Sequence, residues 1–142
     1  MQVRPKVFYT AKGHVTGGRD GEGRSDDGKL TVTLRKPKEM GGDGEGTNPE
    51  QLFAVGYAAC FMGALGVVFD KAGVTLPSDT SIDSSVGLLQ NPDGAMNIQV
   101  GLHVTLPGVQ HDKAQELVDA AHKICPYSNA TRGNIPVNLT VA

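Results

Sequence analysis

The clearest alternation of apolar and polar residues runs through residues 96–106. Apolar side chains occupy every second position there: Met96, Ile98, Val100, Leu102, Val104 and Leu106. A period of two is typical of a β-strand with one buried face. A second strand is predicted for residues 82–88, and Asn91-Pro92-Asp93-Gly94 between the two is a strong turn signal. The pattern therefore predicts an antiparallel hairpin.

The N-terminal part shows a weaker version of the same pattern. Residues 29–35 place Leu30, Val32 and Leu34 on one face of a predicted strand, and an earlier strand is expected around residues 7–15. Residues 17–28 are rich in glycine and charged side chains, which predicts a loop. Residues 41–46 predict a second glycine-rich loop.

A long uncharged segment, residues 52–69, has clear helix signals around it. Asn48 can cap the helix, Pro49 suits its first position, Glu50 favours the positive end of the macrodipole, and Gly73 suits its end. The segment is just long enough to cross a membrane. Many glycines and alanines make it weakly hydrophobic, so we interpret it as a helix buried on all sides in a soluble core, with membrane insertion as the minor alternative.

A second helix is predicted from Asp112 to about Cys125, with an apolar stripe at helical spacing: Ala114, Leu117, Val118, Ala121 and Cys125. Pro126 predicts a break there, followed by a short turn over residues 127–132. A last strand would point Ile135, Val137, Leu139 and Val141 inward. Strands and helices do not alternate regularly, so the predicted class is α+β, in a single domain of residues 1–142.

Composition narrows the function classes. The chain of 142 residues has a net charge of −2, which gives no reason to expect nucleic acid or an anionic membrane as a partner. The first residues carry basic side chains but no apolar run follows them, so no secretory signal is visible and a cytoplasmic location is expected. A stable structural disulfide is not expected in that reducing compartment.

The chain has two cysteines, Cys60 and Cys125, and four scattered histidines. Their spacings match no zinc motif, so neither a metal nor a cofactor is expected. A lone cysteine in an apolar helix is usually a small core residue. Here Cys125 falls on the buried stripe of another helix, so the two sulfurs can meet, and Arg19 in a glycine-flanked loop offers the cation that a reactive thiolate needs.

Several motifs resemble the organic hydroperoxide resistance proteins of the OsmC/Ohr family. They are Gly17-Gly18-Arg19-Asp20-Gly21, Ser25-Asp26-Asp27-Gly28, Thr47-Asn48-Pro49-Glu50-Gln51-Leu52-Phe53-Ala54, Gly56-Tyr57-Ala58-Ala59-Cys60-Phe61, and the run from Ile124-Cys125-Pro126-Tyr127 to Asn134. The match covers nearly the whole chain, in the same order and at similar spacing.

The resemblance implies an intertwined homodimer with antiparallel sheets wrapped around long central helices. It implies a peroxidase in which Cys60 attacks an organic hydroperoxide and Cys125 resolves the product, while Arg19 and Glu50 organise the thiolate. It also implies recycling by a dithiol, such as the dihydrolipoyl groups of lipoylated proteins. Apolar walls would favour organic substrates, with these candidates: Phe53, Tyr57, Phe61, Met62, Ile124 and Tyr127.

Helix geometry places a condition on Glu50. Ten residues separate it from Cys60, which is about 15 Å along a continuous helix. The two side chains of one chain can therefore meet only if the helix breaks, for example near Gly56. Our hypothesis is that residues of both chains of a dimer complete each site.

Two other functions compete with a peroxidase. Residues 29–69 read as strand, glycine-rich loop and helix, as in nucleotide-binding proteins, but Gly42-Asp43-Gly44-Glu45-Gly46 lacks the third fingerprint glycine and a Gly-Lys-Ser/Thr sequence. The other rival is a non-catalytic thiol redox sensor or a carrier of hydrophobic ligands that uses the same cysteine pair.

Overall fold

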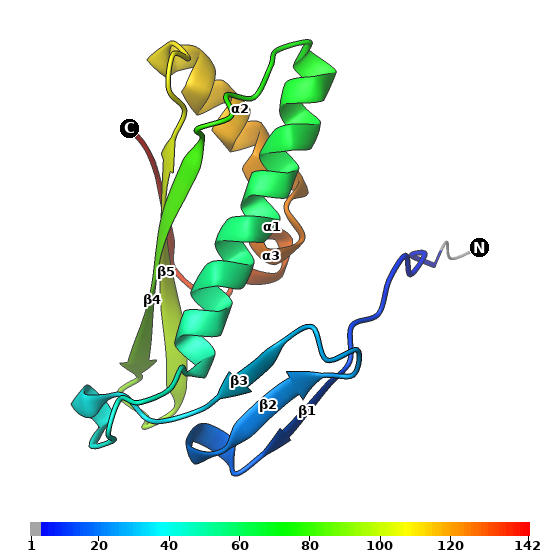
Figure 1. The fold of residues 1–142 in the computed structure, drawn as a ribbon. Coiled ribbons are helices and arrows are strands. Elements are labelled where there is room, and N and C mark those ends of the chain that lie inside the picture. The colour runs from blue at the N-terminus through cyan, green and yellow to red at the C-terminus, as the bar shows by residue number, and fades with distance from the viewer. Residues whose placement is uncertain (1–3) are drawn as a thin grey trace. The chain divides into compact units, whose positions relative to one another are not determined.

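The computed structural model of the chain describes residues 4–142, which form two compact units divided between Pro49 and Glu50 (Figure 1). The first unit contains an antiparallel sheet of β1 (Gly13–Thr16), β2 (Glu22–Ser25) and β3 (Thr31–Thr33) in that order. Two short 3-10 turns, η1 (Gly18–Asp20) and η2 (Lys38–Met40), belong to the same unit. The single domain expected for residues 1–142 stays a prediction.

The central strand of this sheet contradicts the sequence prediction. Residues 17–28 were expected to form a loop, but they contain η1 and β2, and the strand expected around residues 7–15 is confined to Gly13–Thr16. Glycine composition hid β2, because Gly23 sits at its centre. A Cβ at Gly23 would meet the side chains of Val15, Val32 and Leu34 at 3.4–3.6 Å. Gly23 therefore occupies a closely packed strand position, although glycine usually indicates a loop.

The segment that follows β3 folds back onto the end of that strand. Leu34 forms a parallel bridge with Thr47, since Arg35 N–H donates to Thr47 O and Thr47 N–H donates to Thr33 O. Leu34 also exchanges two backbone hydrogen bonds with Gly21, at 2.8 and 3.0 Å. Residues 35–46 therefore form a loop whose two ends are fixed to the same point of the sheet.

The second unit contains α1 (Pro49–Ala72), β4 (Ser81–Gln90), β5 (Met96–Thr105), α2 (His111–Ile124), α3 (Pro126–Thr131) and β6 (Val137–Val141). The predicted hairpin is confirmed, because β4 and β5 pair antiparallel across a turn in which Gly94 adopts a φ of 90°. The sheet order is β4-β5-β6, and β6 runs parallel to β5. The expectation of purely antiparallel sheets is wrong for this sheet, because the helical connection from β5 to β6 brings the chain back in the same direction.

Helix α1 begins at Pro49 and ends before Gly73, whose φ is 69°, so both predicted ends are confirmed. It is not buried on all sides, however. One stripe is buried (Tyr57, Phe61, Ala64, Leu65 and Phe69), whereas Val55 is 72% exposed and Val67 is 45% exposed. A single sheet can cover only one face of a helix, which is why the other face of α1 keeps its apolar surface exposed.

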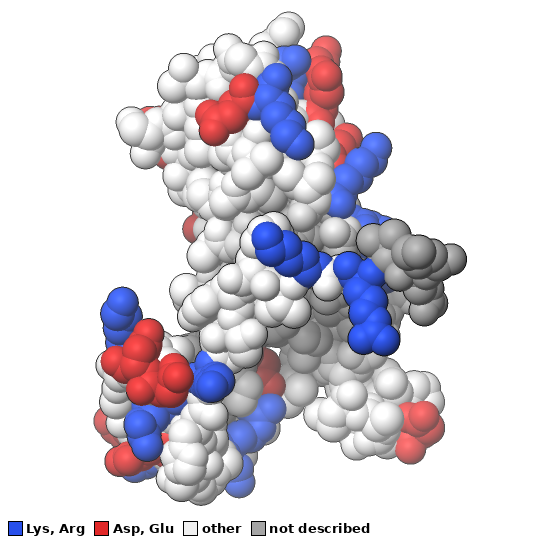
Figure 2. Space-filling model, turned by 90° about the vertical axis from the view of Figure 1, so that its right-hand side faces the viewer, with Lys and Arg blue, Asp and Glu red and all other residues white. Residues whose placement is uncertain are grey.

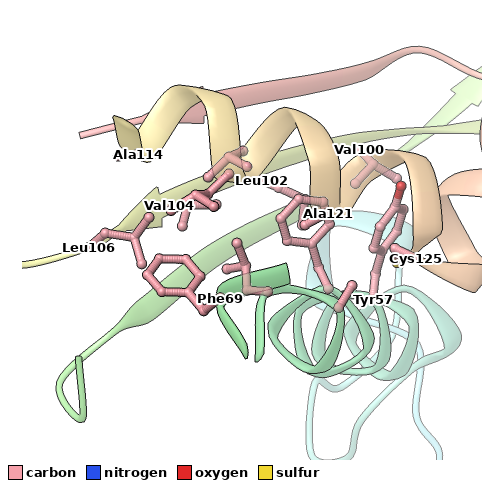
Figure 3. Packing of buried hydrophobic residues seen from close by; sticks show 14 residues of the cluster. Tyr57, Phe69, Val100, Leu102, Val104, Leu106, Ala114, Ala121 and Cys125 are labelled. Carbon is pink, nitrogen blue, oxygen red and sulfur yellow. The ribbon is translucent and has the colours of Figure 1, made fainter. Parts of the chain in front are cut away.

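The core lies between the two long helices and the sheet (Figures 1 and 3). Val100, Leu102 and Val104 of β5 and Leu106 just after it belong to this core, and all four are less than 7% exposed. The predicted stripe of α2 is confirmed residue by residue, since Ala114, Leu117, Val118, Ala121 and Cys125 are all buried there. The core of this unit therefore holds one of the two cysteines.

The segment after Cys125 also differs from the prediction. Residues 127–132 were expected to form a turn, but Pro126 starts a short helix, α3. Proline breaks a helix that precedes it and fits the first position of a helix that follows it. Cys125 stands between the two helices with an extended backbone, at φ −63° and ψ 123°.

By length and composition alone, α1 is long and apolar enough to cross a membrane, as core helices of soluble proteins often are. Its buried stripe packs against β5 and α2, which is what a soluble α+β fold requires. The face in Figure 2 is uncharged over most of its area, and its acidic and basic side chains are intermixed at several places.

Candidate active site

The two cysteines meet in the second unit. Cys60 comes from the middle of α1 and Cys125 from the corner between α2 and α3, and the Cys125 thiol points at Cys60 Sγ over 3.7 Å. Both thiols are free, Cys125 is fully buried, and Cys60 is half-buried. The prediction that residues 65 positions apart bring their sulfurs together is confirmed.

The surroundings of Cys60 within this unit oppose its ionisation. Burial, the largest influence, raises the pKa of the Cys60 thiol above its ordinary value, and the neighbouring Cys125 raises it further because two adjacent sulfurs resist a shared negative charge. The backbone N–H of Tyr127, which hydrogen-bonds to Cys60, acts in the opposite direction and lowers the pKa. A reactive thiolate therefore needs a further positive group.

Three aromatic rings pack against one another, and they come from α1, which carries Cys60, and from α3, which follows Cys125. The ring centroids of Phe53, Tyr57 and Tyr127 are 5.6–5.9 Å from one another. Gly56 lies against the Tyr127 ring, since a Cβ at that position would meet the Tyr127 hydroxyl at 3.4 Å. The cluster gives the site an apolar wall.

A cavity of about 420 Å³ opens beside this wall. Two of the predicted substrate-binding residues, Phe53 and Tyr127, belong to its lining. The rest of the lining comes from the start of β5, the end of α3 and the α3–β6 connection: Asn97, Ile98, Ala130, Thr131, Asn134 and Ile135. Sequence reasoning missed these six residues, because nothing in their local pattern shows that β5 and the α3–β6 connection meet at Phe53.

The other predicted wall residues fall into two groups. Tyr57 and Phe61 have no exposed surface and pack in the core, so they present nothing to a substrate in this conformation. Met62 is half-buried, Ile124 is 42% exposed and Tyr127 is 38% exposed. Surface for a substrate is therefore available at Phe53, Met62, Ile124 and Tyr127.

Arg19 belongs to the first unit, where it lies in η1 at the turn between β1 and β2. Glycines shape this turn: Gly17 and Gly18 have positive φ, and a Cβ at Gly21 would come within 1.8 Å of Thr16 O. Asp20 fixes the turn to the segment that follows β3, because it accepts the Lys36 N–H at 3.2 Å and pairs with the ammonium group of Lys36 at 3.6 Å. The role of Arg19 beside Cys60 stays a prediction.

Glu50 lies in the first turn of α1. The helix continues through Gly56 without a break, so ten helical residues keep the carboxylate about 15 Å along the axis from Cys60 of the same chain. Because α1 has no break near Gly56, a single chain cannot bring Glu50 to Cys60 along this helix.

Sequence reasoning also missed His122 and Ser128. His122 is one of the four scattered histidines that match no metal motif, but its Nδ1 contacts the buried Ser128 hydroxyl at 2.8 Å. Burial, then the Arg132 charge, lower the pKa of His122, while Asp119 raises it. Within residues 4–142, no group of three or more His, Cys, Asp or Glu side chains lies close enough together to hold a metal ion.

Comparison with known proteins gives this arrangement a family. Residues 42–140 match the model of OsmC-like protein. An organic hydroperoxide resistance protein of Xanthomonas axonopodis pv. citri (strain 306) is 54% identical over the full length of both chains. The organic hydroperoxide resistance protein OhrB of Bacillus subtilis (strain 168) is 47% identical over 94% of this chain and 97% of its own.

Solved structures agree with the sequence match. A crystal structure of an organic hydroperoxide resistance protein from Legionella pneumophila is 44% identical, covers 96% of this chain and 99% of its own, and superposes with a TM-score of 0.91. That of Bacillus subtilis OhrB is 45% identical, with coverage of 96% and 100% and a TM-score of 0.87. This chain therefore belongs to the OsmC-like family and, within it, to the organic hydroperoxide resistance proteins.

Proposed function

We propose that the protein is a thiol peroxidase that reduces organic hydroperoxides to alcohols. The observation that carries the proposal is the pair of free thiols, 3.7 Å apart and contributed by two different helical segments. An organic hydroperoxide is the substrate class because the relatives' names specify resistance to it.

The first step is attack of the Cys60 thiolate on the terminal oxygen of ROOH. The O–O bond breaks, its electron pair leaves on the RO⁻ oxygen, and a proton gives the alcohol ROH. Cys60 becomes a sulfenic acid. The Cys125 thiol then attacks the Cys60 sulfur, a disulfide forms and water leaves. An external dithiol restores both thiols by exchange, and we propose lipoyl groups on proteins as its source.

Arg19 would supply the positive charge that Cys60 lacks within its own unit. A guanidinium beside the sulfur lowers the pKa of the thiol and stabilises the charge that develops on the leaving oxygen. Glu50 would orient Arg19 as a bidentate partner. Since α1 is unbroken between Glu50 and Cys60, we propose that a second copy of the chain supplies Arg19 and Glu50 to each cysteine pair.

A homodimer also accounts for the exposed apolar face of α1. Val55 and Val67 lie on that face three turns apart, with Ala59 and Gly63 exposed between them. Small residues at such positions allow a second helix to approach closely. Exposed apolar side chains at Val7, Phe8 and Tyr9 provide further surface for a partner chain.

The cavity next to Tyr127 is the place we propose for the apolar part of the substrate. Polar substitution of a wall residue, such as Phe53→Asn, should weaken turnover of an alkyl hydroperoxide more than turnover of hydrogen peroxide, because only the former has an apolar group to lose contact with. An equal loss for both substrates would reject Phe53 as a wall residue.

The test of the main proposal is steady-state consumption of an alkyl hydroperoxide with dihydrolipoamide as reductant. Cys60→Ser should abolish it. Cys125→Ser should still react once, accumulate the sulfenic acid and lose turnover. Full turnover in Cys60→Ser would overturn the assignment. A non-catalytic sensor, the second candidate, would react in the wild type only once per site, however much dithiol is present.

A further inference from the structure

A network of buried hydroxyl groups joins α1, α2 and α3, the helices that meet at the cysteine pair. Ser128 on α3 is fully buried, and its hydroxyl contacts the hydroxyl of Tyr57 on α1 at 2.8 Å and Nδ1 of His122 on α2 at 2.8 Å. The Tyr57 hydroxyl also contacts Thr131 Oγ1 at 3.2 Å, and Thr131 donates to the Ser128 carbonyl at 3.2 Å. Three helices are therefore joined at one serine.

The hydroxyl protons of this network determine which group donates in each hydrogen bond. The Thr131 proton is used on the Ser128 carbonyl oxygen, which can only accept, so the Tyr57 hydroxyl donates to Thr131. Tyr57 then accepts from Ser128, and Ser128 in turn needs a donor, which is the Nδ1–H of His122. The network thus assigns the His122 tautomer that carries its proton on Nδ1. Protonation of His122 at Nε2 would leave these hydrogen bonds intact.

The joined residues lie at equal distances in sequence from the two sulfurs. Tyr57 precedes Cys60 by three residues on α1, and Ser128 follows Cys125 by three residues on α3. His122 precedes Cys125 by three residues, so its bond to Ser128 spans the corner between α2 and α3. Tyr57 connects that corner to the helix that carries Cys60.

The backbone of the corner itself provides few bonds to α1. Cys125 has an extended backbone between two helices, and Pro126 has no N–H to contribute. The corner's own backbone bonds are Cys125 N–H to Ala121 O and Asn129 N–H to Cys125 O, each at 2.9 Å. Neither of these two bonds reaches α1. The Tyr127 N–H does reach it, but it bonds the Cys60 sulfur itself, whereas the Ser128–Tyr57 contact connects the corner to α1 without involving a sulfur.

We propose that Ser128, held by His122 and Tyr57, is a positioning residue that keeps the Cys125 thiol within reach of Cys60 and thereby sets how readily the disulfide forms. This inference rests on the proposed function for its role in turnover. Its physical content, the proximity of the two sulfurs, can be measured without any peroxide.

The first experiment is a redox titration in glutathione buffers, with the Cys60–Cys125 disulfide quantified by alkylation and intact mass. Two protein thiols and one oxidised glutathione give the protein disulfide and two reduced glutathiones, so the equilibrium constant reports the proximity of the sulfurs. Ser128→Ala and His122→Leu should each lower this constant by about three- to tenfold, the effect of one hydrogen bond.

Two variants separate positioning from general loss of structure. His122→Asn keeps an N–H donor near the place of Nδ1 and should restore most of the wild-type constant. Asn129→Ala removes a surface contact of the same helix, the 2.7 Å bond from Arg132, and should leave the constant unchanged. If Ser128→Ala does not fold, the half-buried His122 position carries the test, because leucine there buries no new polar group. An unchanged constant in folded His122→Leu, or equal losses in His122→Leu and His122→Asn, would overturn the proposal.

The second experiment follows one turnover with an alkyl hydroperoxide. The peroxide-dependent oxidation of Cys60 should stay within about twofold of wild type in Ser128→Ala, whereas the peroxide-independent disulfide step should slow by about three- to tenfold, with more sulfinic acid at Cys60. Equal slowing of both steps would contradict a role specific to Cys125. A wild type that ignores hydroperoxides, with the redox titration as expected, would refute the proposed function and leave the positioning role standing.

Discussion

At the scale of single residues, Cys60 has an environment that does not activate it on its own. Burial and the Cys125 thiol raise the pKa of Cys60, and the Tyr127 N–H only partly opposes them. Peroxide attack requires the thiolate, so an unassisted Cys60 would be mostly protonated at neutral pH. The reactivity of Cys60 should therefore respond directly to any cation placed beside it.

This gives a prediction for Arg19. In Arg19→Ala, the pH midpoint of Cys60 alkylation should move upward, because the sulfur loses the charge that favours its ionised form. The midpoint is measured from alkylation rates against pH in a Cys125→Ser background. Arg24→Ala, which removes an exposed arginine from the adjoining strand β2, is the control and should leave the midpoint in place. Equal midpoints in all three proteins would refute Arg19 as the activating cation.

His122 leads to a prediction on stability. Its pKa in the folded chain is lowered from the ordinary value of 6.5 by burial and by Arg132. Between the lowered value and about pH 6.5, the unfolded chain binds more protons than the folded chain, so this residue makes stability fall as the pH drops below that point. His122→Asn should lose less Tm than the wild type between about pH 7.5 and pH 5.5. A steeper loss in the variant would show that His122 has the opposite sign.

At the scale of elements, the turn that carries Arg19 is tightly constrained. Gly21 exchanges backbone hydrogen bonds with Leu34, and its α-carbon faces the Thr16 carbonyl with no room for a side chain. The turn thus presents Arg19 from a fixed frame. A change in the frame should act on chemistry even though no reacting atom is touched.

Gly21→Ala tests this frame. A Cβ there would lie 1.8 Å from Thr16 O, so the backbone must shift, at a cost of about 1–3 kcal/mol. We expect a lower Tm and slower oxidation of Cys60 by an alkyl hydroperoxide. Gly13→Ala is the matched control, since its Cβ would meet its nearest neighbour at an ordinary 3.7 Å. Normal oxidation by Gly21→Ala would show that the frame has no part in catalysis.

The elements also show what could be predicted from the sequence. Helix α1 was predictable because Asn48, Pro49 and Gly73 mark its ends, and β5 because its alternation is unbroken. Strand β2 was not, because its glycine and charged residues resemble a loop, and it is stabilised by pairing with strands on both sides. The meeting of Cys60 and Cys125 followed from their buried stripes. The contact of Ser128 with Tyr57 and His122 had no sequence signal, since hydroxyl partners are set by tertiary packing.

At the scale of the whole molecule, the proposed active site needs two copies of the chain, and the exposed face of α1 offers the surface. Val67→Asp places a charge on that face and should shift the protein from dimer toward monomer by sedimentation or light scattering. Met96→Asp, the same change at another exposed apolar residue, should leave the oligomeric state intact. A dimer equally stable in both variants would exclude this face of α1 as the interface.

Mixed dimers test which chain supplies the charge. Arg19→Ala and Cys60→Ser are each expected to be inactive alone, but co-refolding should recover about a quarter of the wild-type sites if Arg19 serves the partner's cysteine. The arithmetic is that half of the dimers are mixed, and one of their two sites is intact. If Arg19 serves its own chain, no site is intact in any dimer. Absence of recovery in verified mixed dimers would therefore contradict the shared site.

The bridge between Leu34 and Thr47 has a practical consequence for protein engineering. Because both ends of residues 35–46 are fixed to the same point of β3, added length between them is not transmitted to the strand or to the first turn of α1. A short epitope inserted after Asp43 should therefore be displayed without loss of peroxide consumption. The same epitope inserted after Arg19 should abolish it.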